Sequence, residues 1–334
     1  MEARMDAKVT KREKKKGSLL ARILLTPEVG VLIPILILCV ITTGIKPKFM
    51  TWKYLSSILK GCVFIGAASL GQAFISIAGE IDLSVGLNGC LSGVMTAVAC
   101  CRWHWGMVPC LLAGIGTGCL VGLINGLLNR RLGLHSWITT LATQFICNGL
   151  AVTISEGEPM SIADLGLSGF NRLKPLGLNW LFFIFLGLLI LSDLVVRRTK
   201  FGYKLRAVGG NENAAKVAGI NVDKIKIAAF VISGFFAAIG GLFDVVNEGA
   251  ASSAFGGGRE FRTIICVNIG GIAAGSGSFI SVGLGVLLFH VLWYALRILA
   301  VDTNLQLVLI GAILVLAVIL DIFRKRYEAR LIVR

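Results

Sequence analysis

The chain has 334 residues, of which 56% are hydrophobic and only 15% are charged, and its mean hydropathy is +0.83. Soluble domains average about 25% charged residues, so this composition excludes an ordinary water-soluble fold. The formal net charge of +15 could suggest a nucleic-acid partner, but the basic residues are concentrated in a few segments between long uncharged runs. That distribution indicates a membrane protein with no nucleic-acid partner.

Long uncharged runs follow one another along the chain. A run of about 18 or more apolar residues can cross the roughly 30 Å hydrocarbon core of a bilayer as a helix, which satisfies its backbone polar groups internally. The run at 263–296 is too long for one crossing, and its glycine-rich middle at 270–278 is typical of a helix end, so we divide it into a short span and a full one. The sequence therefore predicts an all-α polytopic bundle of about ten transmembrane helices, one of them short or discontinuous. The runs are 29–45, 61–79, 83–101, 103–129, 132–155, 175–192, 227–243, 263–296 and 303–320.

Basic residues mark one side of the predicted bundle. Alternate spans place the segments that hold 23 of the 33 Lys and Arg residues on the same face, which the positive-inside rule assigns to the cytoplasm. We therefore expect both termini in the cytoplasm, with a basic tail at 1–28, a transmembrane domain at 29–323 and a second tail at 324–334. The basic segments run through Arg22, at Arg130 and Arg131, from Arg197 to Lys226, and from Arg324 onward.

The largest internal hydrophilic segment covers residues 197–226, here called the basic segment. Asn211 or Asn213 can cap the N-terminus of a short helix within it, and Gly219 suits the C-terminal end of that helix. We expect this helix to lie along the cytoplasmic face of the membrane, where a separate ATPase subunit could grip it.

The motif GEIDLSVG at 79–86 places Glu80 and Asp82 between two apolar runs. Carboxylates at membrane depth are costly, so they face a cavity, a partner or an exposed helix end. Asp82 or Ser84 could cap the helix that we expect to start near Leu83. The motif could equally act in gating or in the solute path, and a proton relay between the two carboxylates is a smaller possibility.

Amide side chains inside the predicted spans have two possible roles, because they can bond a neighbouring helix or bind solute hydroxyls. Trp137 and Phe145 could stack on a sugar, although packing is the more common role of such side chains. Asp244 and Glu248, near the outer end of the seventh span, could receive a solute-binding protein or belong to an ordinary solvated loop. The candidates for gating or the solute path are Gln72, Glu80, Asp82, Ser84, Asn88, Asn125, Asn148 and Asn268, with Gln144 a further amide inside a span.

Catalytic and metal-binding patterns are missing from the sequence. There is no GxxxxGK[ST] phosphate loop, so ATP hydrolysis is expected in a separate subunit. The three His residues are far apart, and the nine Cys residues are scattered without ligand spacing. We expect no catalytic residue, no metal and no enzyme activity in this chain, and we expect the cysteines to be small packing residues.

Four motifs occur along the chain in a specific order: GEIDLSVG (79–86), GLINGLLNRRLGLHSWITTLAT (122–143), TKFGYKLRAVGGNENAAKVAGINV (199–222), and Glu260 followed by IGG at 269–271. With them, the chain resembles the ribose-type ABC importer permeases, a family with members for ribose, xylose, galactose, related sugars and autoinducer-2. The resemblance extends from about Val29 to Arg326. Family members commonly have a run like ELDAIAAVVIGG, whereas this chain has Arg262 in place of the acid and Asn268 in place of an apolar residue.

The resemblance implies a set of partners in the plasma membrane of a bacterium. These are a second permease subunit, identical or paralogous, two cytoplasmic ATPase subunits that bind ATP and Mg²⁺, an external solute-binding protein, and a small-molecule sugar. It implies ten helices around a central translocation path and no cofactor in this chain. It also implies that 199–222 holds the helix that couples to the ATPase, which carries over onto Gly202, Gly209, Asn211, Ala214, Ala215 and Gly219.

The primary hypothesis is a permease subunit that imports a monosaccharide or a related small polyol by alternating access, driven by the separate ATPase. One alternative keeps the ABC class and changes the cargo to nucleosides or branched-chain amino acids. Another is an ion-coupled secondary transporter, in which Glu80 and Asp82 would be coupling sites. An intramembrane enzyme is the least favoured alternative.

Overall fold

The computed structural model describes residues 27–162 and 175–302, together with 304–306, 308, 309, 311, 312 and 315. The predicted tails, apart from residues 27 and 28, and most of the predicted last span at 303–320 lie outside the described residues. Within the described part, seven helices are long and apolar enough to cross a membrane, and an eighth, shorter helix is also apolar. The prediction of a polytopic helical bundle is confirmed.

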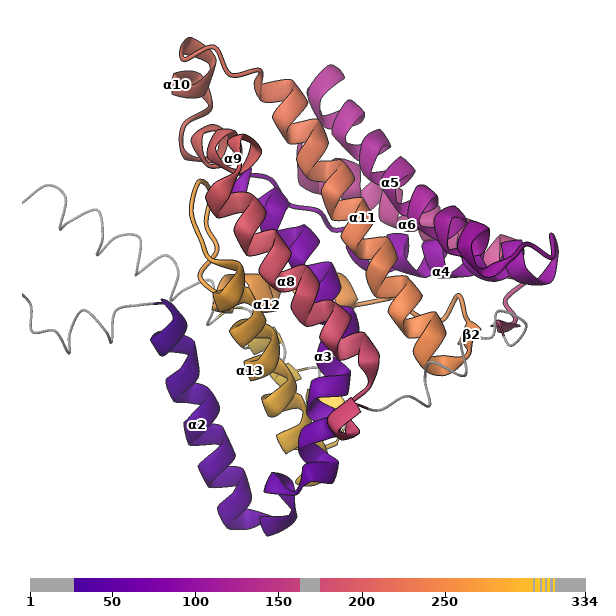
Figure 1. Cartoon of the computed structure of the whole chain (residues 1–334), viewed down its shortest axis with the longest axis vertical. Helices are drawn as coiled ribbons and strands as arrows, with labels where there is room; N and C mark the ends of the chain where they lie inside the picture. The colour runs from indigo at the N-terminus through magenta and orange to yellow at the C-terminus, as the bar shows by residue number, and fades with distance from the viewer. Residues whose placement is uncertain are drawn as a thin grey trace, which may run out of the picture.

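The helices are arranged as a bundle with a few short connections (Figure 1). The two short strands pair antiparallel, with Met160 opposite Ala251. In chain order the elements are α2 (Pro27–Ile45), η3 (Pro47–Met50), α3 (Trp52–Ile77), α4 (Val85–Cys101), α5 (Met107–Arg131), α6 (Ser136–Ser155), β1 (Met160–Ser161), η5 (Pro175–Gly177), α8 (Trp180–Arg198), α9 (Lys200–Gly210), α10 (Glu212–Val217), α11 (Val222–Glu248), β2 (Ala250–Ala251), α12 (Arg259–Ile269) and α13 (Phe279–Ile298).

The helices extend beyond several of the uncharged runs. The run predicted at 61–79 corresponds to a helix that begins at Trp52, and the run at 227–243 to one that covers Val222–Glu248. Charged residues are therefore part of the helix ends, where long side chains such as Lys keep their stems on apolar surface and their charged groups in water.

The long apolar run at 263–296 is interrupted, as predicted. Helix α12 ends at Ile269, α13 begins at Phe279, and a connection at 270–278 joins them. In that connection Gly271 has φ of 71° and Gly277 of 139°, which is backbone that glycine adopts without a steric penalty. The short helix and the full helix of the prediction are α12 and α13.

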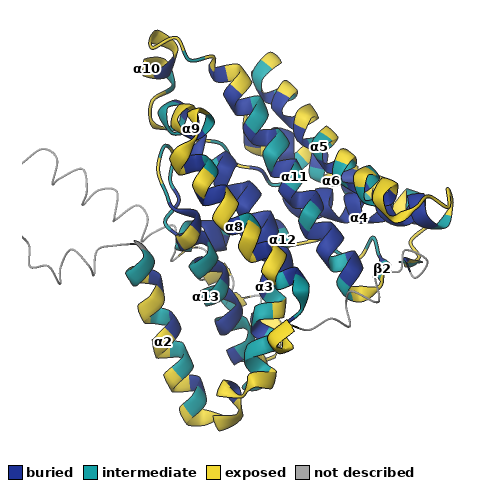
Figure 2. Cartoon of the chain, in the orientation of Figure 1, coloured by how far each residue is buried: buried dark blue, intermediate teal, exposed yellow. Residues whose placement is uncertain are grey.

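The centre of the bundle is formed by α3, α4 and α11, which are buried along most of their length, whereas few residues of α2 are buried (Figure 2). Glycines allow the central helices to approach one another closely. A Cβ atom on Gly234 of α11 would collide with the carbonyl oxygen of Gly118 in α5, and one on Gly241 would collide with that of Gly89 in α4. Small residues at such crossings let helices pack in a lipid environment.

The bundle has two distinct ends. One end gathers the connection between α3 and α4, the end of α5 and the basic segment with α9 and α10 (Figure 1). The start of α2 lies on this side too, since Ser281 in the first turn of α13 donates a hydrogen bond to Glu28 (3.0 Å). The opposite end carries β1 and β2, and an exposed ion pair between Arg102 and Glu156 (2.9 Å).

Candidate functional site

Side-chain caps start two consecutive helices in the basic segment, α9 and α10. Thr199 accepts a hydrogen bond from the Gly202 amide at the start of α9 (3.2 Å). Asn211 accepts one from the Ala214 amide at the start of α10 (2.9 Å). Residue Gly219, with φ of 78°, then turns the chain after α10. The predicted helix, its Asn211 cap and its glycine end are confirmed.

Two glycines bring α9 into contact with its neighbours. A Cβ atom on Gly202 would collide with the Val196 carbonyl oxygen in α8, and one on Gly209 with the Ile77 carbonyl oxygen at the end of α3. The Ile77 oxygen also accepts a hydrogen bond from the Gly275 amide (2.9 Å). The end of α3, helix α9 and the connection between α12 and α13 therefore form one compact junction.

Helix α10 has an inner face and an outer face. Ala215 is buried against the rest of the chain, whereas Ala214 is exposed and Val217 is 91% exposed. Sequence reasoning missed Val217, because Ala218 and Ile220 beside it are apolar as well and nothing in the sequence marks Val217 as exposed. An apolar side chain at the tip of a helix on the outer surface suits contact with another protein.

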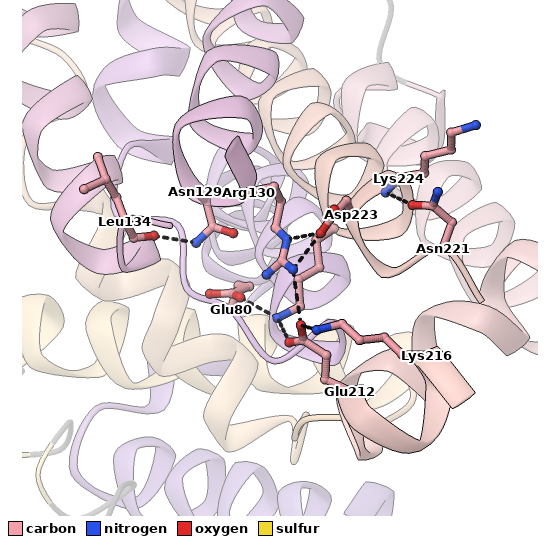
Figure 3. A network of polar contacts seen from close by, with 10 residues as sticks. Glu80, Asn129, Arg130, Leu134, Glu212, Lys216, Asn221, Asp223 and Lys224 are labelled. Atoms are coloured by element: carbon pink, nitrogen blue, oxygen red, sulfur yellow. Dashed lines mark hydrogen bonds and ion pairs between the residues drawn. The ribbon is translucent and has the colours of Figure 1, made fainter. Parts of the chain in front are cut away.

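Glu212 in α10 joins the helix to the bundle (Figure 3). It accepts ion-pair hydrogen bonds from Arg130 at the end of α5 (3.2 Å), from Lys226 near the start of α11 (2.8 Å) and from Lys216 within α10 (3.0 Å). Arg130 in turn contacts Asp223 (2.6 Å). The hydrogen bond from Lys226 is the main reason that the pKa of Glu212 falls from an ordinary 4.5 to about 2.

The ammonium group of Lys226 also contacts Glu80, in the connection between α3 and α4, at 2.7 Å. The Lys226 side chain is only 8% exposed, so the cation lies between two carboxylates with little access to water. The sequence indicated Glu80 as a candidate, but it did not indicate Arg130, Glu212 or Lys226. Their positions beside helix ends were the available signal, and their pairing depends on the tertiary structure.

A second polar cluster surrounds Asp82, which is completely buried. One carboxylate oxygen accepts from the amide (2.9 Å) and the hydroxyl (2.6 Å) of Ser84, and the other accepts from the Ser233 hydroxyl in α11 (2.7 Å). Asn125 in α5 donates to the Ser84 hydroxyl (3.0 Å) and accepts from Thr143 in α6 (2.8 Å). Helix α4 begins at Val85, near Leu83 as expected, with Ser84 at its N-cap position. The Ser84 hydroxyl donates to Asp82 and makes no capping hydrogen bond.

Gln144 in α6 and Glu260 in α12 form a third polar contact at 2.9 Å. Glu260 is buried, and its second carboxylate oxygen has no hydrogen-bond partner in the described part of the chain, nor has the amide oxygen of Gln144. A Cβ atom on Gly86, in the first turn of α4, would lie 2.8 Å from the same Glu260 oxygen. The pair therefore offers two unused acceptors beside the start of α4.

The remaining predicted residues are distributed through the bundle and do not join these clusters. Gln72 and Asn88 are buried, and Asn88 donates to the Gly118 carbonyl oxygen of α5 (3.3 Å), which is a bond between helices. Asn148 in α6 and Asn268 in α12 are half-buried. Trp137 and Phe145, on α6 as well, are exposed.

At the end opposite α10, a cavity of about 240 Å³ lies between α3, α8, α11 and α13, and Lys60, Glu248 and Tyr294 are among the residues that line it. Asp244, at its edge, pairs with Arg259 of α12, so this carboxylate joins α11 to α12. Within the residues that the structure describes, no three His, Cys, Asp or Glu side chains gather closely enough to hold a metal ion.

Residues 54–318 match the family described as branched-chain amino acid transport system, permease component. The chain belongs to this family. Among curated relatives of the permease, the L-arabinose ABC transporter permease protein of Azospirillum brasilense is 31% identical over 89% of this chain and 88% of its own length. The galactose/methyl galactoside import permease protein of Escherichia coli K12 is 31% identical over 88% and 94%, and its ribose import permease protein is 28% identical over 87% and 92%.

A solved structure of a metal-chelate type ABC transporter in an inward-facing conformation is also similar to the permease. The alignment with that structure covers 83% of this chain and 89% of that chain, with 16% sequence identity and a TM-score of 0.47.

Proposed function

We propose that this chain is the membrane-spanning subunit of an ABC importer that carries a monosaccharide or a related small polyol into a bacterial cell. The family match over residues 54–318 supports the permease role. The curated relatives named above are permeases for arabinose, galactose and ribose, each aligned over most of both chains. Those names favour a sugar over the branched-chain amino acids of the family's description.

The observation that carries the proposal is the construction of α9 and α10. The two helices lie at one end of the bundle and present an apolar side chain, Val217, at the end of α10. The ion pairs of Glu212 join α10 to α5 and α11. A separate ATPase subunit, with ATP and Mg²⁺ bound to it, would contact this surface. Gly202, Gly209, Asn211 and Gly219 would set its shape, with Ala214 outside and Ala215 inside.

The same surface gives the orientation that we propose. The end with α9 and α10 carries Arg130, Arg131 and the basic residues from Arg197 to Lys226, and basic segments favour the cytoplasmic side. The start of α2 lies at this end, which supports a cytoplasmic N-terminus. A solute-binding protein would dock at the opposite end, and a second permease subunit would complete the translocation path.

Transport by alternating access requires only that nucleotide and binding protein favour different conformations of the bundle, because a ligand shifts an equilibrium by its differential affinity for the two states. Polar side chains such as Asp82, Asn125 and Gln144 would serve this path or hold its helices. Selection among sugars would then belong mainly to the binding protein.

The test is uptake by proteoliposomes that contain this chain, its ATPase subunit and its binding protein. We expect uptake of a labelled pentose or hexose that requires ATP and that unlabelled leucine or adenosine does not reduce. Ala215→Trp should abolish uptake, because Ala215 is buried and a Trp would displace α10. Uptake that runs on an ion gradient without the ATPase, or that survives Ala215→Trp with the ATPase still bound, would contradict the proposal.

A further inference from the structure

The connection between α3 and α4, residues 78–84, holds both Asp82 and Glu80 and so links the Asp82 cluster to the ion pairs of α10. At its start, Glu80 accepts from Lys226 at 2.7 Å, and Lys226 donates to Glu212 of α10 at 2.8 Å. The chain of contacts therefore runs from α10 through one buried ammonium group to the connection 78–84 (Figure 3).

We infer that Glu80 is a positioning residue through which α10 moves the connection 78–84 and, with it, α4, α6 and α11. This inference rests on the proposed function, because it assumes that α10 receives the movement of an ATPase. It assigns Glu80 to transmission of force and not to the solute path or to a proton relay.

Hydrogen bonds tie the connection to α6 and α11, so a movement of the connection is passed to both helices. Its Ile81 amide donates to the Ser136 hydroxyl (3.4 Å) and its Leu83 amide to the Thr140 hydroxyl (2.9 Å), both in the first turns of α6. Asp82 accepts from Ser233 of α11. A displacement of Glu80 would therefore reach α6 and α11 through hydrogen bonds, and α4 through the chain itself.

The end of α3, directly before the connection, is held as well. Gly209 of α9 packs directly on the Ile77 carbonyl oxygen, and the Gly275 amide donates to the same oxygen. Helix α9 therefore contacts the end of α3 by backbone packing, and α10 reaches Glu80 through the ammonium group of Lys226 in α11. A displacement of α9 and α10 would act on the residue just before the connection as well as on Glu80.

Lys226 suits a contact that has two states. Its side chain is buried between two carboxylates, and a buried charge that loses its partner is strongly destabilised. If α10 moves away from the connection, Lys226 keeps one carboxylate and releases the other, so no state leaves it unpaired. Such an exchange gives two discrete arrangements, which coupling between sites requires.

The experiment measures solute imported per ATP hydrolysed, with the full complex in proteoliposomes. The test variant is Glu80→Gln, which leaves Lys226 paired with Glu212. The matched control is Glu156→Gln, which removes an exposed ion pair of similar length, 2.9 Å, at the opposite end of the bundle. We expect both variants to bind the ATPase and to hydrolyse ATP within about twofold of the parent protein.

The ratio of solute to ATP should fall at least about fivefold in Glu80→Gln, the lower end of typical coupling between sites, and stay unchanged in Glu156→Gln. Glu80→Asp, which keeps the charge, should retain an intermediate ratio even if Glu80→Gln assembles poorly. An unchanged ratio in assembled Glu80→Gln, or equal ratios in Glu80→Asp and the parent, would overturn the inference. If the parent complex itself shows no ATP-driven uptake, the proposed function fails instead.

Discussion

At the residue scale, Lys226 is the side chain on which most of the polar structure near α10 depends. It contacts carboxylates from two different parts of the chain, and its side chain is nearly excluded from water. Lys216 contacts the same carboxylate of Glu212, but its side chain is 53% exposed. The two lysines therefore make similar contacts in very different surroundings.

We predict that Lys226→Met lowers the free energy of unfolding by about 3–5 kcal/mol, the usual effect of removing one member of a buried ion pair. Glu80 and Glu212 would then face each other without their shared cation. Lys216→Met should change stability by less than about 1 kcal/mol, as exposed pairs do. Thermal unfolding in detergent measures both, and equal effects of the two substitutions would show that burial of Lys226 is unimportant.

The pKa of Glu212, lowered to about 2 from 4.5, gives a prediction for pH. Because the carboxylate is more acidic in the folded protein, its contribution to stability is complete above pH 4.5 and is lost as the pH falls toward 2. Glu212→Gln should therefore destabilise the protein at pH 7, and the difference from the parent should shrink below pH 4.5. Unfolding followed at pH 7, 4 and 3 measures this, and a difference that is the same at all three would contradict it.

At the element scale, the basic segment contains two capped helices, α9 and α10. The start of α10 at Asn211 and the turn after it at Gly219 could be predicted, because capping depends on neighbouring residues in the sequence. The interruption between α12 and α13 could be predicted for the same reason, from the glycines at 270–278. The partner of Glu80 could not, because Lys226 is 146 residues away in the sequence and meets it only through packing.

We predict that Gly209→Ala displaces α9 from the end of α3, because the new Cβ atom would collide with the Ile77 carbonyl oxygen. Hydrogen exchange of the α9 amides should become faster and the melting temperature should fall. Gly210→Ala is the matched control, since nothing lies within 4 Å of a Cβ atom there, and alanine is the better helix former by about 1 kcal/mol. If both variants behave alike, the close approach at Gly209 has no consequence.

We predict that Val217→Asp weakens binding of the ATPase subunit while the bundle stays folded, because Val217 is 91% exposed at the tip of α10. Leu176→Asp is the control, since Leu176 is a similarly exposed apolar residue in η5, at the opposite end. Co-purification of the ATPase with each variant measures the difference. Undiminished recovery with Val217→Asp would remove α10 from the contact surface.

At the scale of the whole molecule, the two ends of the bundle differ in charge and construction. Composition and the length of the uncharged runs sufficed to predict the helical class, because the bilayer imposes both. The Asp82 cluster was predictable only in part, since Ser84 is near in sequence whereas Ser233 is 151 residues away. A charge count also could not show that α10 and the connection 78–84 lie at one end and are linked through Lys226.

We predict that cysteines placed at positions 217 and 176, in a variant without the nine native cysteines, react from opposite sides of the membrane. A membrane-impermeant maleimide applied to intact cells should label the Leu176→Cys protein, and it should label the Val217→Cys protein only after lysis. Labelling of position 217 in intact cells would reverse the orientation and place α10 away from any cytoplasmic ATPase.

Helix α2 packs mainly against α13 among the longer helices, and apolar side chains such as Leu36 and Val40 are exposed along it. During synthesis α2 is made before the other helices that the structure describes, and α13 follows only after most of the chain has been made. Until then the face of α2 that packs on α13 lies against lipid, which a segment that is apolar on all sides tolerates. The contact between α2 and α13 therefore forms late in biogenesis, and a chain truncated before Phe279 would lack the helix against which α2 mainly packs.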